Sequence, residues 1–167
     1  MKINKDHLYH GAALTQVAEH RTFKAINEMS PGGVRSRCAF RINADIYLYL
    51  KYTAIKPRGP AREFIFNFNA DSLAELQALQ SPPQKIFICL ICVKASHICC
   101  INYDTFLALI KQRKLRKGAD EQSYQIIVTL PAGKQFRVYM NFPDRRNLKI
   151  GPDTKVPRDD FPHIIFE

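Results

Sequence analysis

Several features that identify common enzyme classes or membrane proteins are absent from this sequence. The chain has only seven glycines, and none of them forms the spacing of a phosphate-binding loop or of a dinucleotide-binding turn. No serine stands in a nucleophile-elbow context, so no Ser-His-Asp arrangement is identifiable. The longest apolar runs, such as residues 86–93, are far too short to span a bilayer. The sequence therefore gives no support to nucleotide-loop enzymes, α/β-hydrolases or membrane-spanning proteins.

The cysteines are odd in number, and no signal peptide is recognisable at the N-terminus. We therefore expect a cytoplasmic protein with free thiols and no membrane association. Cys89, Cys92, Cys99 and Cys100 are close enough in sequence to invite a zinc site. However, they lie in two apolar strand patterns, where residues one or three apart point to opposite faces. We expect them to be core residues of a sheet that is buried on both faces, with no metal bound.

Length and composition predict a globular protein with an acidic partner. With 167 residues, 46% of them hydrophobic and 11% aromatic, the chain is long and apolar enough to bury a core. We expect a single α+β domain over residues 1–141 and a tail over residues 142–167. The formal net charge of +10 favours nucleic acid or an acidic protein as a partner.

Periodicity predicts the element order α-βββ-α-ββ-α-ββ. The expected helices cover residues 6–28, 71–80 and 104–118, and the expected strands cover 37–42, 46–51, 63–68, 85–93, 97–102, 124–130 and 135–140. Clean two-residue alternation in the first three strands predicts an antiparallel meander. We expect one mixed, mostly antiparallel sheet flanked by three helices, with Pro82 and Pro83 ending the second helix. The proline-rich tail is expected to be irregular, with its apolar end at 163–166 docked on the domain.

One candidate nucleic-acid surface is the outer face of the predicted meander. If the aliphatic residues of its first two strands point to the core, the residues between them share the other face: Arg37, Arg41, Tyr47, Tyr49 and Lys51. Single-stranded nucleic acid binds such a face because rings stack on bases and cations follow the backbone. The alternative is that a helix covers this face and the tyrosines only pack.

A second basic group ends the third predicted helix. Cations there offset the helix dipole, but five within seven residues exceed that need and are typical of phosphate contacts. The five residues are Lys111, Arg113, Lys114, Arg116 and Lys117. Lys56 and Arg58, in the loop between the second and third strands, extend the basic surface.

The order helix–strand–strand–strand–helix–strand over residues 6 to 93 resembles the core of restriction-endonuclease-like nucleases, the PD-(D/E)xK group. That resemblance implies carboxylates that hold Mg²⁺ and activate water. The corresponding positions are Asp45 at the start of the second strand, Glu63 on the third and Glu19 on the first helix. Two residues after Glu63 stands Ile65 rather than the lysine of that group, so the catalytic motif is not matched.

These observations lead to one main functional expectation and two alternatives. The main expectation is a small basic nucleic-acid-associated binding protein without catalysis and without a cofactor. The first alternative is a protein-interaction or small-ligand module, including a homodimer. The second is a metal-dependent nuclease. His7 and His10 have the spacing of two metal ligands on a helix, but no third ligand is evident.

Overall fold

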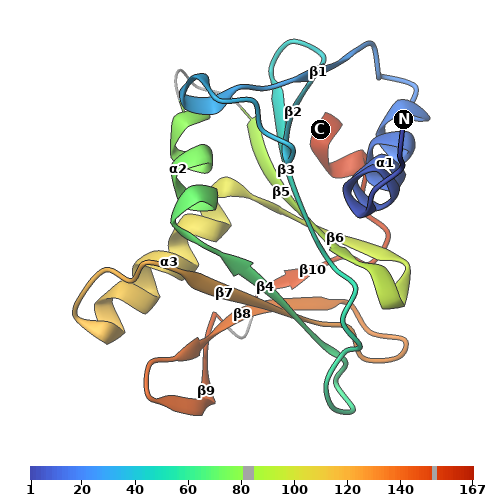
Figure 1. The fold of residues 1–167 in the computed structure, drawn as a ribbon. Coiled ribbons are helices and arrows are strands. Elements are labelled where there is room, and N and C mark those ends of the chain that lie inside the picture. The colour runs from blue at the N-terminus through green and yellow to red at the C-terminus, as the bar shows by residue number, and fades with distance from the viewer. Residues whose placement is uncertain (81–84, 152–153) are drawn as a thin grey trace.

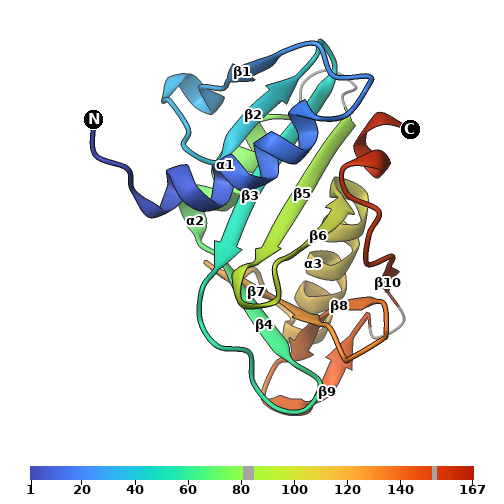
Figure 2. The same cartoon turned by 90° about the vertical axis from the view of Figure 1, so that its right-hand side faces the viewer.

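The computed structural model describes residues 1–80, 85–151 and 154–167. Within these residues the chain is α+β, with three helices and two sheets (Figures 1 and 2). The helices are α1 (Lys5–Ala18), α2 (Ala70–Ala78) and α3 (Tyr103–Lys117). The strands are β1 (Ile26–Glu28), β2 (Ala39–Ile42), β3 (Ile46–Thr53), β4 (Glu63–Phe68), β5 (Lys85–Cys92), β6 (His97–Asn102), β7 (Tyr124–Thr129), β8 (Phe136–Phe142), β9 (Arg145–Ile150) and β10 (Lys155–Val156). The α+β class is confirmed, whereas the prediction of a single sheet is wrong.

The first sheet, sheet A, has the strand order β1-β2-β3-β5-β6. Its central strands β3 and β5 are parallel, with Ile46 opposite Lys85 and Thr53 opposite Cys92. The other neighbours, including the predicted β2–β3 pair, are antiparallel. Strands β3 and β5 are almost continuously apolar, as expected for strands that are buried on both faces.

The second sheet, sheet B, has the order β10-β8-β7-β4, and β9 pairs with the other end of β8. The two strands predicted over 124–130 and 135–140 are β7 and β8, and they pair as an antiparallel hairpin. The predicted meander is wrong at its third strand, because β4 pairs with β7 instead of β3. Residues 54–62 carry the chain from sheet A to sheet B, and α2 then leads it back to β5 beside β3 (Figure 2).

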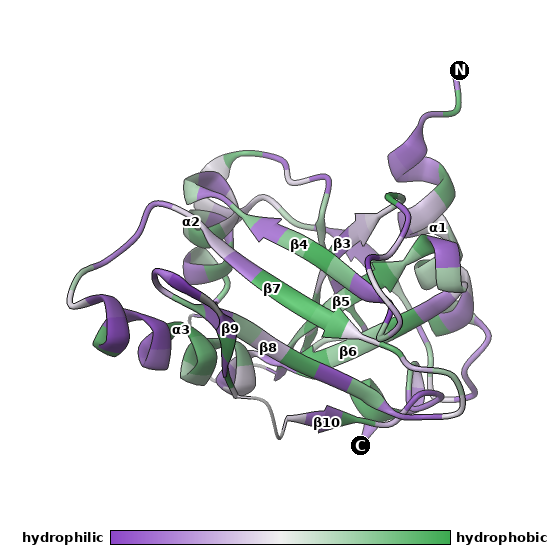
Figure 3. Cartoon of the chain, turned by 90° about the horizontal axis from the view of Figure 1, so that it is seen from below, coloured by the Kyte–Doolittle hydropathy of each residue, from purple (hydrophilic) through white to green (hydrophobic). Residues whose placement is uncertain are grey.

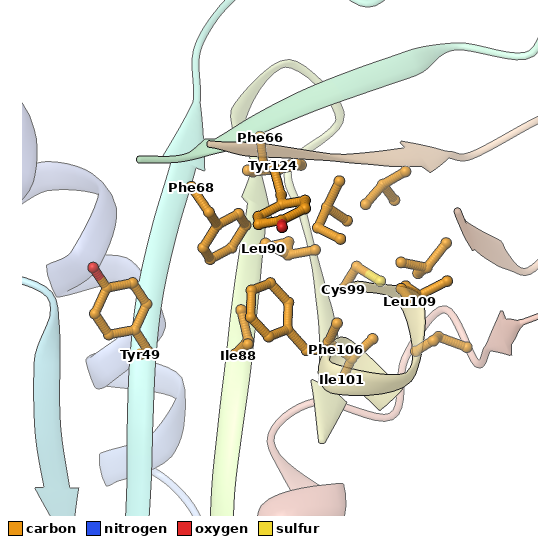
Figure 4. Packing of buried hydrophobic residues seen from close by; sticks show 14 of the residues in the cluster. Tyr49, Phe66, Phe68, Ile88, Leu90, Cys99, Ile101, Phe106, Leu109 and Tyr124 are labelled. Atoms are coloured by element: carbon orange, nitrogen blue, oxygen red, sulfur yellow. The ribbon is translucent and has the colours of Figure 1, made fainter. Parts of the chain in front are cut away.

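The larger core cluster lies between the two sheets, α2 and α3. Figure 4 shows the rings of Phe66, Phe68, Phe106 and Tyr124 gathered there above Ile88 and its neighbours. Phe68 and Phe106 are in direct contact, with ring centroids 4.8 Å apart. Alternate residues of β4, β7 and β8 point into this cluster, so each of these strands has one face in the core.

A second core cluster lies on the other face of sheet A, beneath α1 and the short C-terminal 3-10 helix η3 (His163–Phe166). The two clusters divide the strand cysteines as predicted, because Cys92 and Cys99 belong to the first cluster and Cys89 and Cys100 to the second. All five cysteines are free thiols. Both faces of sheet A are therefore covered.

The helix boundaries differ from the predicted ones. Helix α1 is capped by Asn4, whose side chain accepts a hydrogen bond from the His7 amide, and it ends at Ala18. The prediction of a helix over 6–28 is wrong because residues 26–28 form β1 on the edge of sheet A. Gly118 ends α3 in the left-handed conformation, at φ +76°, as its position predicts. Pro82 and Pro83, predicted to end α2, lie outside the described residues.

The C-terminal tail contains more regular structure than predicted. Strands β9 and β10 both pair with β8, so the expectation of a wholly irregular tail is wrong. Its apolar end docks as expected: Ile165 is fully buried in the second core cluster. None of the described helices has the length and apolar character needed to cross a membrane.

Candidate nucleic-acid interface

The tyrosines proposed to stack on bases are buried. Tyr47 is 6% exposed and Tyr49 is 2% exposed, and both belong to the cluster between the sheets. Leu76 of α2 and Leu79, the C-cap residue of that helix, pack in the same cluster on this side of β3. The prediction that these rings lie on an open surface is wrong, because α2 and sheet B occupy the space above them.

The basic residues predicted on the same face, Arg37, Arg41 and Lys51, do not form a common surface either. The Lys51 ammonium donates a hydrogen bond to the Asn67 carbonyl and lies 5.0 Å from the centre of the Phe68 ring. Burial lowers the pKa of Lys51. Arg41 is half-buried, and its Nε atom has no hydrogen-bond partner among the described residues. Only Arg37 is exposed, so the five residues do not form one binding surface.

The basic end of α3 is partly used for structure. The Arg113 guanidinium donates to both carboxylate oxygens of Glu121, at 2.8 and 2.9 Å, and also to the Asn141 carbonyl. These hydrogen bonds lower the pKa of Glu121. Lys114 pairs with Asp120 at 3.0 Å. Arg113 and Lys114 therefore tie the residues after α3 to the helix.

The remaining cations of α3 are available at the surface. Lys111, Arg116 and Lys117 are exposed. The Arg116 guanidinium lies 4.9 Å from the centre of the Phe142 ring, which places the helix end beside the β8–β9 hairpin (Figure 1). In the sequence, residues 111–121 and 141–149 together hold eight basic and three acidic residues. Their net charge of +5 is half of the +10 of the whole chain.

The outer face of sheet B has no covering helix among the described residues, although Ile127, Thr129 and Tyr139 on it are buried. Figure 3 shows the outer face of sheet B toward the viewer, and none of the described helices lies over it. Strand alternation and register place nine residues of β4, β7 and β8 on this face: Glu63, Ile65, Asn67, Gln125, Ile127, Thr129, Arg137, Tyr139 and Asn141. The outer sides of β9 and β10 add Lys149, opposite Asn141, and Lys155, opposite Arg137.

The loop over residues 54–62 forms a wall along this face. A hollow of about 370 Å³ between the loop and the strands is lined by Lys56, Arg58, Ile65, Gln125 and Asn141, among others. We call this face with its wall the basic groove, and define it by its five exposed cations Lys56, Arg58, Arg137, Lys149 and Lys155. The cations surround the face from both sides, so a polyanion lying along it meets positive charge at each edge.

The acidic residue of this face, Glu63, accepts a hydrogen bond within the protein. Glu63 is the sole Asp or Glu in strands β4, β7 and β8, and its Oε1 accepts a hydrogen bond from the Tyr139 hydroxyl at 2.7 Å. Burial and the Glu63 carboxylate raise the pKa of Tyr139, so the phenol stays protonated. The Lys149 ammonium lies 4.4 Å from the centre of the Tyr139 ring.

The three carboxylates of the nuclease hypothesis lie on different elements. Glu19 caps the C-terminus of α1, Asp45 lies in the turn between β2 and β3, and Glu63 begins β4 in sheet B. Over the described ranges, no group of three or more His, Cys, Asp and Glu side chains is arranged to hold a metal ion. The structure thus does not bring these three residues together as a ligand set.

Sequence reasoning located some of this interface and missed the rest. Lys56 and Arg58 were identified from their loop, but Arg137, Lys149 and Lys155 were not. The available signal was the alternation of Arg137 with apolar neighbours in β8, which marks it as outward-facing. Compared with protein-family models, with curated proteins and with solved structures, the chain gives no match, so the geometry of the groove carries the functional argument.

Proposed function

We propose that this protein binds nucleic acid through the phosphate backbone and does not catalyse a reaction on it. The observation that carries the proposal is the basic groove: a sheet face without a covering helix among the described residues, bordered by five exposed cations, whose glutamate accepts a hydrogen bond from a tyrosine. Lysine and arginine side chains that neutralise phosphates release condensed counterions, which drives binding without sequence readout.

The groove favours phosphate contacts over base stacking. Tyr139, the aromatic residue on the outer face, is 2% exposed and has Lys149 over its ring. A stacking platform needs open rings, so we expect binding with little preference for sequence. The exposed cations of α3, beside the β8–β9 hairpin, lengthen the contact surface beyond the groove.

A pair of charge reversals tests this proposal. Arg58→Glu together with Arg137→Glu changes the groove charge by four units on two sides, and position 137 lies opposite Lys155, so a glutamate there is tolerated. The matched control is Lys24→Glu together with Lys94→Glu, two exposed lysines outside the groove. Fluorescence anisotropy with labelled DNA and RNA at low salt measures both proteins.

We expect the groove variant to lose binding by at least tenfold more than the control, with both variants unfolding at the wild-type temperature. Equal losses in the two variants would show that net charge alone, rather than the basic groove, accounts for the affinity. Unchanged binding in the groove variant would place the contact elsewhere on the molecule.

A further inference from the structure

A second hollow lies on the opposite side of the fold from the basic groove. It has a volume of about 610 Å³ and lies between the first half of α1 and the segment that leads from β1 into β2. Helix α1 packs on the face of sheet A that is turned away from sheet B. We call this site the α1 hollow. Its lining includes His7, His10, Gly11, Leu14, Arg37 and Phe40.

His7 lines the α1 hollow, and its hydrogen bond with the cap of α1 determines which ring nitrogen carries the proton. Its Nδ1 accepts a hydrogen bond from the Asn4 backbone amide at 3.2 Å, as part of the cap that begins α1. An imidazole nitrogen that accepts from an amide carries no proton, so the neutral ring carries its proton on Nε2. The cap therefore fixes the tautomer of His7.

His10 has a free hydrogen-bond acceptor where His7 has a donor. Its Nδ1 lies 3.1 Å from the Arg37 carbonyl oxygen, and a carbonyl only accepts, so Nδ1 carries the proton and Nε2 has a free lone pair. The side chain is 5% exposed, and its burial lowers the pKa of His10, which keeps the ring neutral. Nε2 has no hydrogen-bond partner among the described residues, although the ring lines the α1 hollow.

The two histidines are one helical turn apart and therefore lie on the same side of α1. Around them, Leu14 and Phe40 supply apolar surface, and the space beside Gly11 is open, since an added Cβ atom there meets nothing within 4 Å. Arg37 supplies an exposed positive charge. The other arginine of the lining, Arg35, is paired with Glu28.

We propose that the α1 hollow binds a nucleotide, with the edge of the base on His7 and His10 and the phosphate on Arg37. Every nucleobase has an acceptor next to a donor on its pairing edge, which matches the Nε2–H of His7 and the Nε2 lone pair of His10. Apolar surface from Leu14 and Phe40 suits the flat ring. This site is separate from the basic groove and does not depend on it.

Asparagine variants, which keep a polar atom near the position of Nδ1 and remove Nε2, test the hydrogen bonds of the two histidines separately. In His10→Asn the amide group takes the place of Nδ1–H and keeps the bond to the Arg37 carbonyl, while the Nε2 acceptor is lost. In His7→Asn the amide oxygen keeps the cap with Asn4, while the Nε2 donor is lost. The probes are the four ribonucleoside 5′-monophosphates, titrated by calorimetry into the wild-type protein and both variants.

We expect at least one of the nucleotides to bind the wild type, and each variant to bind it about tenfold more weakly, the effect of one lost hydrogen bond. The nitrogen NMR resonance of His10 Nε2 in the wild type is expected to shift when the nucleotide is added. The Arg58→Glu/Arg137→Glu variant is expected to bind the nucleotide normally. The absence of binding at millimolar nucleotide, or a His10 resonance that does not move, would overturn the proposal.

Discussion

The burial of Tyr49 is the clearest disagreement between the structure and the hypothesis of an open arginine–tyrosine face. Tyr49 is 2% exposed and packs near Phe68, with ring centroids 6.5 Å apart. A buried aromatic side chain removes about 150–250 Å² from water, worth roughly 4–6 kcal/mol at about 25 cal/mol per Å². Truncation of such rings to alanine costs about 3–5 kcal/mol in measured cases. We therefore expect Tyr49→Ala to lower the free energy of unfolding by about 3–5 kcal/mol.

Guanidinium chloride unfolding followed by circular dichroism measures this change, because the chain has no tryptophan for a fluorescence assay. Tyr49→Phe is the matched control: it keeps the ring, and we expect a loss below about 1.5 kcal/mol. If Tyr49→Ala instead costs less than about 0.5 kcal/mol, as is usual for a surface residue, and also weakens nucleic-acid binding, the side chain lies on an open face and the described packing is contradicted.

Three further predictions concern titration and ion pairing. Burial lowers the pKa of His10 from 6.5, so the unfolded chain binds a proton at a higher pH than the folded protein does, and the free energy of unfolding falls as the pH drops below about 6.5. We expect His10→Asn to reduce this fall, measured by chemical unfolding at pH 7.5 and 5.5, and an unchanged pH dependence in the variant would contradict the prediction. Burial raises the pKa of the Cys38 thiol to about 11, so we expect the native protein to react very slowly with a thiol reagent at pH 8, and all five cysteines to react rapidly after denaturation. Rapid labelling of the native protein would refute this prediction. Glu121→Gln breaks the ion pair with Arg113, and we expect a loss of about 1–2 kcal/mol in chemical unfolding; no loss would show that the pair contributes nothing.

The strands were predictable because two-residue alternation and apolar runs are local properties. Neighbours joined by a short turn, β2–β3 and β7–β8, were also predictable. The partner of β4 was not, since the period of a strand gives its two faces but not its neighbour. The alternation of β4 fits equally well beside β3 or beside β7. Strand β9 was missed because the prolines around it, such as Pro143, favour irregular structure.

The error at the candidate site came from treating tyrosine as a polar residue. In β3 the tyrosines alternate with Ile46, Leu48 and Leu50, so counting their rings as apolar makes the strand buried on both faces. The pairing of Arg113 with Glu121 was also beyond local reasoning, because it depends on the turn after Gly118. Lys56 and Arg58 were identifiable, because charged residues in a loop that contains Pro and Gly remain at the surface.

The salt dependence of binding tests most directly whether the basic groove binds phosphates. The association constant of the wild-type protein for duplex DNA is measured by anisotropy across a salt series. Five phosphate contacts, one for each groove cation, predict a slope of log K against log salt of about −4.5, and contacts from α3 make it steeper. A slope near zero, or no binding at low salt, would contradict the claim.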